Sequence, residues 1–225
     1  MQNFDFMSRE VKPRVDRAIK ESLEIYLNKL NYGLYQLGVE APLQLHVMKI
    51  LEQKLDQYTL STEERFVIDL EKNIPLCGRR DEVDGVIEYY LRGELKEQYL
   101  IEFKYKKRVH GGPNSGNLDA YVDIYELERQ KATNRLVKGC YFIFVTNDQR
   151  FTIPGDDPSA NRMVFPLYDG YKIEKRRYIP QVPAAVRQLR KSHYEELEFG
   201  EEYEIKYRVA RTNSGNNYWF FLLEI

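Results

Sequence analysis

Residues 82–107 read EVDGVIEYYLRGELKEQYLIEFKYKK, two runs rich in β-branched and aromatic residues on either side of a short turn at residues 92–94. Such runs around a turn predict a β-hairpin. Each run also carries an acid among apolar neighbours, Asp84 in the first and Glu102 in the second. The two acids are therefore the first candidates for a functional site.

The chemistry of this hairpin follows from strand geometry. Side chains alternate faces along a strand, so Glu102 and Lys104 point the same way and Phe103 points the other way. A carboxylate inside a core strand is unfavourable unless it is paired or binds a metal, and two close carboxylates repel each other. Their hard oxygens favour Mg²⁺, with Mn²⁺ as a substitute. A lysine beside them can contact an attacking water and a scissile phosphate, which suits phosphodiester hydrolysis.

The hairpin resembles the active-site hairpin of the PD-(D/E)xK nuclease superfamily, which includes many restriction endonucleases. In that family, an acid on one strand precedes an acid–x–lysine motif on the next strand. Asp84 corresponds to the first acid and Glu102–Phe103–Lys104 to the E-x-K motif, while Val83 stands where the family name has proline. The resemblance implies that Asp84 and Glu102 bind the metal and that Lys104 is catalytic with them.

Two further residues enter through this resemblance. Many family members add a metal-binding acid from the helix before the hairpin, and Glu40 is placed for that role. Glu40 is equally well explained as an ordinary carboxylate near a helix N-terminus. Gln130, on the helix after the E-x-K strand, either faces the site, as a polar residue does in some relatives, or belongs to the surface. Asp69 and Glu71, on the first strand, are lesser candidates.

The wider pattern predicts an α/β fold. Its order of elements resembles the α-β-β-β-α-β core of this family, so the resemblance implies a restriction-endonuclease-like mixed β-sheet core flanked by helices. The expected elements are a helix from Glu40, a strand over residues 66–70 that breaks at 73–75, the hairpin, a loop over 110–117, a helix over 118–138 capped by Asp119 and ended by Gly139, and an apolar strand over 140–148.

The chain divides into three regions on this pattern. Residues 1–39 form an N-terminal helical region, and residues 40–148 form the nuclease core. Residues 149–225 form a C-terminal extension of loops, a short helix over 186–197 and a terminal β-hairpin. The resemblance covers the core and leaves the extension outside it.

Charge bears on the partner. The formal net charge of the 225-residue chain is −1, so a nucleic-acid surface has to be local rather than global. Basic residues near the hairpin are the candidates for DNA phosphate contacts, namely Arg79, Arg80, Lys106, Lys107 and Arg108. A second basic stretch covers residues 172–191, although charge runs are more often simply solvated.

Compartment is indicated by what the sequence lacks. The two cysteines, Cys77 and Cys140, show no metal-binding spacing and suit small core positions. The N-terminus has no apolar signal segment, and no run of about 18 apolar residues predicts a membrane span. We therefore expect a cytoplasmic protein with no membrane partner.

The leading hypothesis is a Mg²⁺-dependent DNA endonuclease of type II restriction character, acting on double-stranded DNA. The chain has the size of a simple restriction enzyme, which would act as a homodimer on a palindrome. One alternative is a nuclease fold that serves as a DNA-binding or assembly module without cutting, and another is a repair or mobile-element nuclease. The plainest alternative is a solvated sheet face carrying Glu102 and Lys104, with Asp84 paired across the strands.

Overall fold

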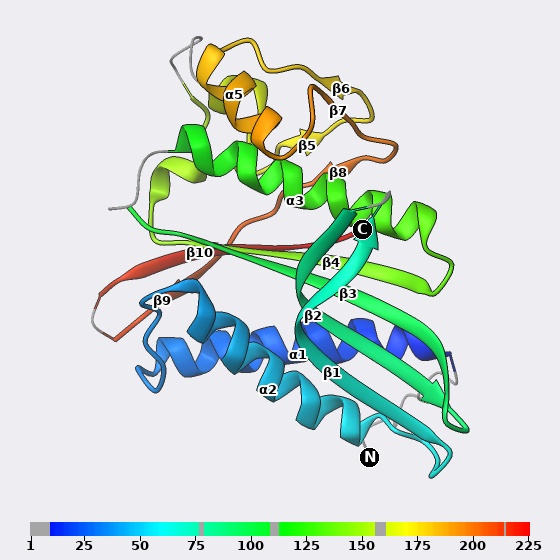
Figure 1. The fold of residues 1–225 in the computed structure, drawn as a ribbon. Coiled ribbons are helices and arrows are strands. Elements are labelled where there is room, and N and C mark those ends of the chain that lie inside the picture. The colour runs from blue at the N-terminus through cyan, green and yellow to red at the C-terminus, as the bar shows by residue number, and fades with distance from the viewer. Residues whose placement is uncertain (1–9, 77–78, 109–112, 156–160, 214) are drawn as a thin grey trace.

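A central sheet flanked by helices organises the computed structural model, which describes residues 10–76, 79–108, 113–155, 161–213 and 215–225 (Figure 1). In chain order the elements are α1 (Val11–Asn31), α2 (Glu40–Gln57), β1 (Glu64–Leu76), β2 (Arg79–Leu91), β3 (Glu94–Lys106), α3 (Pro113–Thr133), β4 (Val137–Thr146), η1 (Gln149–Phe151), α4 (Asn161–Val164), β5 (Lys172–Ile173), β6 (Arg177–Tyr178), α5 (Pro183–Lys191), β7 (Leu197–Glu198), β8 (Tyr203–Glu204), β9 (Arg208–Arg211) and β10 (Asn217–Glu224).

The central sheet has six strands in the order β1-β2-β3-β4-β10-β9. Its β3–β4 pair is parallel and the other neighbouring pairs are antiparallel, so the sheet is mixed. The expected α/β class is confirmed, and α2 to β4 follow the expected order of helix, three strands, helix and strand. The β2–β3 connection is a two-residue turn in which Arg92 (φ 54°) and Gly93 (φ 79°) are both left-handed, as the favoured hairpin turns require.

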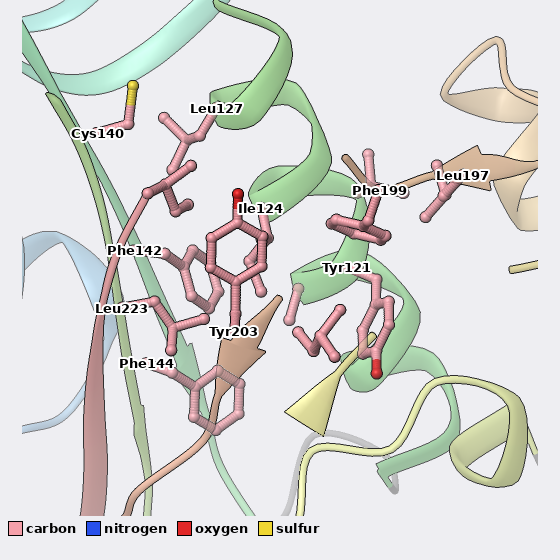
Figure 2. Packing of buried hydrophobic residues seen from close by; sticks show 14 of the residues in the cluster. Tyr121, Ile124, Leu127, Cys140, Phe142, Phe144, Leu197, Phe199, Tyr203 and Leu223 are labelled. Atoms are coloured by element: carbon pink, nitrogen blue, oxygen red, sulfur yellow. The ribbon is translucent and has the colours of Figure 1, made fainter. Parts of the chain in front are cut away.

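The two faces of the sheet pack against different helices (Figure 1). Ile101 and Phe103 of β3 are buried in one core with α1 and α2, whereas Leu100 is buried in the other core with α3. Figure 2 shows that second core, where Phe142 of β4 packs toward Ile124 of α3. Strand alternation therefore directs Glu102 and Lys104 to the α3 face, opposite Phe103, as expected.

Strands β1 and β2 form a two-stranded ribbon, and near Asp84 the side chains on one face of β2 pass from one core to the other. Ile87 is buried with α1 and α2, but Val83, four residues earlier, is buried with α3. A Cβ atom at Gly85 would lie 2.5 Å from Cε of Met48, so the absence of a side chain lets the ribbon approach α2 closely. Asp84 is thus held at the crossing point between the two cores.

The first strand differs from the expectation. The predicted break at residues 73–75 is wrong, because β1 runs unbroken through Pro75, which pairs with Arg80. Proline is tolerated there because β1 is the edge strand and needs no donor on its outer side. The irregularity lies instead at Glu71, whose φ is 52° and which falls between the Leu70–Gly85 and Lys72–Val83 pairs.

The helix after the hairpin also differs from the expectation. Residues 113–117 were expected in a loop, yet α3 begins at Pro113, a residue whose fixed φ and missing N–H suit a first helical position. Because the helix starts at Pro113, Asp119 lies within it rather than capping it, and the helix ends at Thr133. Gly139, expected just past the helix end, lies inside β4.

The C-terminal region is more integrated than the expected extension. The β9–β10 hairpin forms as predicted, but β10 pairs with β4 and continues the central sheet. The short helix α5 covers 183–191 rather than 186–197. Residues after β4 therefore complete the sheet and the α3-side core rather than standing apart from them.

Two smaller expectations concern the membrane and the cysteines. Of the helices in the described ranges, none has the length and apolar character needed to cross a bilayer. Cys140 is a buried free thiol, and burial raises its pKa to about 12. Cys77 lies outside the described residues.

Candidate active site

Asp84 and Glu102 occupy neighbouring strands at the end of their ladder. The last β2–β3 pair is Gly85 with Ile101. Asp84 precedes Gly85 and Glu102 follows Ile101, so both acids lie just beyond this pair. Oδ2 of Asp84 accepts a hydrogen bond of 2.7 Å from the main-chain N–H of Phe103. The hairpin thus brings the first acid directly against the E-x-K segment.

Glu102 lies among other acids, and these perturb its carboxyl group. Burial, together with the nearby charges of Asp123 and Asp84, raises its pKa well above the usual glutamate range, and Lys104 offsets this only in part. A buried carboxylate among other acids is stable only with a proton or a cation beside it. The position therefore favours a proton or a bound cation over a bare carboxylate.

Lys104 is held by a carboxylate from the other side of the site. Its Nζ lies 2.8 Å from Oδ2 of Asp123, and about a fifth of each side chain is exposed (20% and 19%). Burial alone would lower the pKa of Lys104, but Asp123, Glu40 and Glu102 outweigh burial and raise it. The side chain of Lys104 is therefore positively charged at neutral pH.

Asp123, which pairs with Lys104, is not among the candidates from the sequence. It lies on α3 one helical turn after Asp119, and Asp119 pairs with Lys106 at 2.7 Å. Four residues of helix advance about 6 Å, close to the roughly 6.6 Å between alternate strand residues. The sequence contains this signal, because two lysines at spacing two precede two helical acids at spacing four.

Glu40 is the first residue of α2, and its side chain contacts β3, the strand that carries the E-x-K motif. Its Oε2 accepts a hydrogen bond from the main-chain N–H of Tyr105. Burial raises the pKa of Glu40, Lys104 and the Tyr105 N–H lower it, and Asp84 adds a smaller upward contribution. The candidate acid before the hairpin is therefore in electrostatic contact with the lysine and the first acid.

Gln130 does not lie beside Lys104. It is buried at 2% exposure, and its Nε2 lies 3.5 Å from the carbonyl oxygen of Pro75 at the end of β1. It is seven residues after Asp123, about 10 Å along the helix. Gln130 is therefore neither a surface residue nor a neighbour of the lysine, and it ties α3 to the β1–β2 ribbon.

An open cavity of about 510 Å³ leads to the first acid. Its lining is largely apolar, and it combines residues of α2 with residues of the ribbon: Ala41, Pro42, Gln44, Leu45, His46, Leu70, Glu71 and Asp84. Glu71 therefore borders the site. The other lesser candidate, Asp69, pairs with Lys72 at 3.1 Å.

The candidate DNA-contact residues differ in their partners and exposure. Lys106 is paired with Asp119, whereas Nζ of Lys107 lies 6.0 Å from the ring centroid of Tyr105 and Arg108 is exposed just after β3. Arg79 and Arg80 belong to β2, but their side chains lie outside the described residues.

The donor chemistry suits a hard cation. Among the described residues, no three His, Cys, Asp or Glu side chains already converge as a formed metal cluster. Glu40, Asp84, Glu102 and Asp123 nevertheless act on one another electrostatically, and Lys104 balances only part of their charge. A divalent cation between Asp84 and Glu102 would relieve this repulsion, and carboxylate oxygens are what Mg²⁺ prefers.

No protein-family model, curated protein or solved structure matches this chain. The functional assignment therefore depends on the residues and geometry of the site.

Proposed function

We propose that this chain is a Mg²⁺-dependent DNA endonuclease of the PD-(D/E)xK type with a restriction-endonuclease-like core. The observation that carries the proposal is the contact between Asp84 and the E-x-K segment, in which Asp84 accepts the Phe103 N–H at 2.7 Å. Lys104 lies on the same face as Glu102 and is a half-buried cation paired with Asp123. Two acids and a lysine in this relation are the groups that phosphodiester hydrolysis needs.

Each side chain has a role in this proposal. Asp84 and Glu102, with Glu40 as a third donor, would hold Mg²⁺. When bound, Mg²⁺ supplies Lewis acidity and lowers the pKa of a bound water. The ammonium of Lys104 orients that water and offsets the charge that develops on the phosphate.

The substrate we propose is double-stranded DNA, because basic residues continue directly from the site. Lys106, Lys107 and Arg108 follow Lys104 along β3 and into the next loop. Lysine and arginine contacts with phosphates supply the sequence-independent part of DNA affinity. A restriction enzyme of this size would act as a homodimer, with each subunit cutting one strand.

The test is incubation of the purified protein with plasmid and phage DNA, in Mg²⁺, in Mn²⁺ and in chelator. We expect metal-dependent cleavage that the chelator abolishes. DNA binding without cleavage in either metal would favour the assembly module. Cleavage restricted to branched or damaged DNA would favour a repair or mobile-element nuclease.

A further inference from the structure

Two lysine–aspartate pairs join β3 to α3, and they differ in their surroundings. Lys104 pairs with Asp123 and Lys106 pairs with Asp119, at 2.8 and 2.7 Å. In the first pair the aspartate is 19% exposed, and in the second it is 37% exposed. Only the first pair lies among the candidate metal-binding acids, because the charge of Lys104 also acts on Glu40 and Glu102.

The carboxylates of Asp123, Glu40 and Glu102 all act electrostatically on the ammonium of Lys104. It sits on a flexible four-carbon chain and carries three donors that can rotate among them. If it paired with Glu102 or Glu40, it would occupy the oxygens that a divalent cation needs. The carboxylate that holds it in this structure is Asp123, which comes from α3 rather than from β2, β3 or α2.

We propose that Asp123 is a positioning residue that holds the Lys104 ammonium on the α3 side of the site, so that this ammonium does not compete with Mg²⁺ for the oxygens of Glu102 and Glu40. This inference rests on the proposed nuclease function. Asp123 acts through Lys104, and it need not touch the metal or the DNA.

A purely structural role is the competing explanation, since a salt bridge between a helix and a strand also fixes their packing. The Lys106–Asp119 pair provides the matched control, because it joins the same two elements one helical turn away. Asp119 also accepts a hydrogen bond from Gln188 of α5, so its structural connections are at least as extensive. A structural role predicts similar effects at both aspartates.

The experiment is calorimetric titration of Mg²⁺ into the full-length protein. Asp123→Asn should weaken Mg²⁺ binding by about tenfold or more, the size found for residues that orient metal ligands. Asp119→Asn should leave Mg²⁺ affinity unchanged. Lys104→Met should bind Mg²⁺ at least as tightly as the wild type, because the competing ammonium is gone. In cleavage assays, Asp123→Asn should lower kcat and leave KM for DNA unchanged.

The double variant Asp123→Asn with Lys104→Met separates positioning from direct ligation. It leaves no unpaired buried charge at this pair, so it should fold even if Asp123→Asn alone does not. If Asp123 acts only through Lys104, the double variant should match Lys104→Met within about threefold, as a double-mutant cycle requires. A double variant at least about tenfold weaker than Lys104→Met would make Asp123 a ligand and overturn the positioning role.

Two other outcomes are distinct. Wild-type binding of Mg²⁺ with an unchanged affinity in Asp123→Asn overturns this inference and leaves the nuclease proposal standing. A wild-type protein that neither binds Mg²⁺ nor cleaves DNA overturns the proposed function itself, and this inference with it. Asp123→Glu, which keeps the carboxylate, should retain Mg²⁺ affinity, and its melting temperature without metal reports on folding.

Discussion

The carboxylate of Asp84 accepts a hydrogen bond of 2.7 Å from the main-chain N–H of Phe103, the residue between Glu102 and Lys104. The side chain of Phe103 is buried on the α1–α2 side, so its two neighbours along β3 face α3. One backbone donor therefore holds the carboxylate of the first acid beside the E-x-K segment.

Removing the charge of Glu102 should stabilise the metal-free protein. Burial and the neighbouring acids disfavour the Glu102 carboxylate, so we expect Glu102→Gln to raise the free energy of unfolding in chelator at about pH 7.5. Mg²⁺ at about 100 times its Kd should stabilise the wild type by about 2.7 kcal/mol and the variant by less. Urea denaturation measures both effects. A variant that is less stable in chelator yet gains fully from Mg²⁺ would contradict this expectation.

Lysine and arginine should not be interchangeable at position 104. We expect Lys104→Ala to lose cleavage by about a hundredfold or more while Mg²⁺ still binds, because the water and phosphate lose their cation. Lys104→Arg should recover little activity, since a planar guanidinium does not replace a compact ammonium paired with Asp123. Single-turnover cleavage and calorimetry measure the two properties separately. Full activity in Lys104→Arg would show that any cation suffices.

Lowering the pH should break the ion pair between Arg14 of α1 and Glu64 of β1. Nη1 of Arg14 lies 3.0 Å from Oε2 of Glu64, and Tyr89 donates a hydrogen bond to Oε1. Burial alone would raise the pKa of Glu64, but these donors and the N–H of Leu60 outweigh it and lower the pKa. A lowered folded-state pKa gives stability that is present above the unfolded value of about 4.3 and is lost as pH falls through the folded value.

The measurement for this pair is Glu64→Gln across pH. We expect a loss of about 3 kcal/mol at pH 7, because the buried guanidinium of Arg14 loses its carboxylate partner and keeps only its bonds to backbone carbonyls. The difference from the wild type should shrink as pH falls below about 4.3. Glu63→Gln is the control, since the Glu63–Arg92 pair is exposed and should contribute little. A difference that stays constant down to about pH 2 would contradict the linkage.

DNA affinity should depend on salt through unequal contributions. We expect Lys107→Ala and Arg108→Ala each to weaken DNA binding and to reduce the salt slope by about one. Lys106→Ala should have a smaller effect because Asp119 already pairs with this lysine. Fluorescence anisotropy with a non-cleaving Lys104→Ala protein, between about 50 and 200 mM salt, gives the slopes. Wild-type binding that is insensitive to salt would exclude a phosphate-tracking surface.

The sequence predicted what depends on local pattern. The hairpin over residues 82–107 and the apolar strand that became β4 both follow from alternation, turn residues and β-branched content. The same alternation placed Glu102 and Lys104 on one face. The start of α2 at Glu40 also matched, with Pro42 tolerated in the first turn.

What the sequence did not predict depends on neighbours distant along the chain. Pro75 indicated a break, but its strand lies at the sheet edge, which only the complete strand order reveals. Asp123 is an unremarkable helical acid until α3 packs on the sheet opposite Lys104. The pairing of β10 with β4 likewise joins residues that are about eighty positions apart.

The most direct test of the central proposal is metal-dependent cleavage by Asp84→Ala and Glu102→Ala compared with the wild type. Each change removes a proposed Mg²⁺ ligand, and loss of metal-assisted catalysis worth several kcal/mol corresponds to about a hundredfold or more in rate. We expect both variants to fold and to lose cleavage in Mg²⁺, while wild-type cleavage is abolished by chelator. Cleavage that persists at the wild-type rate in both variants, purified free of contaminating nuclease, would contradict the proposal.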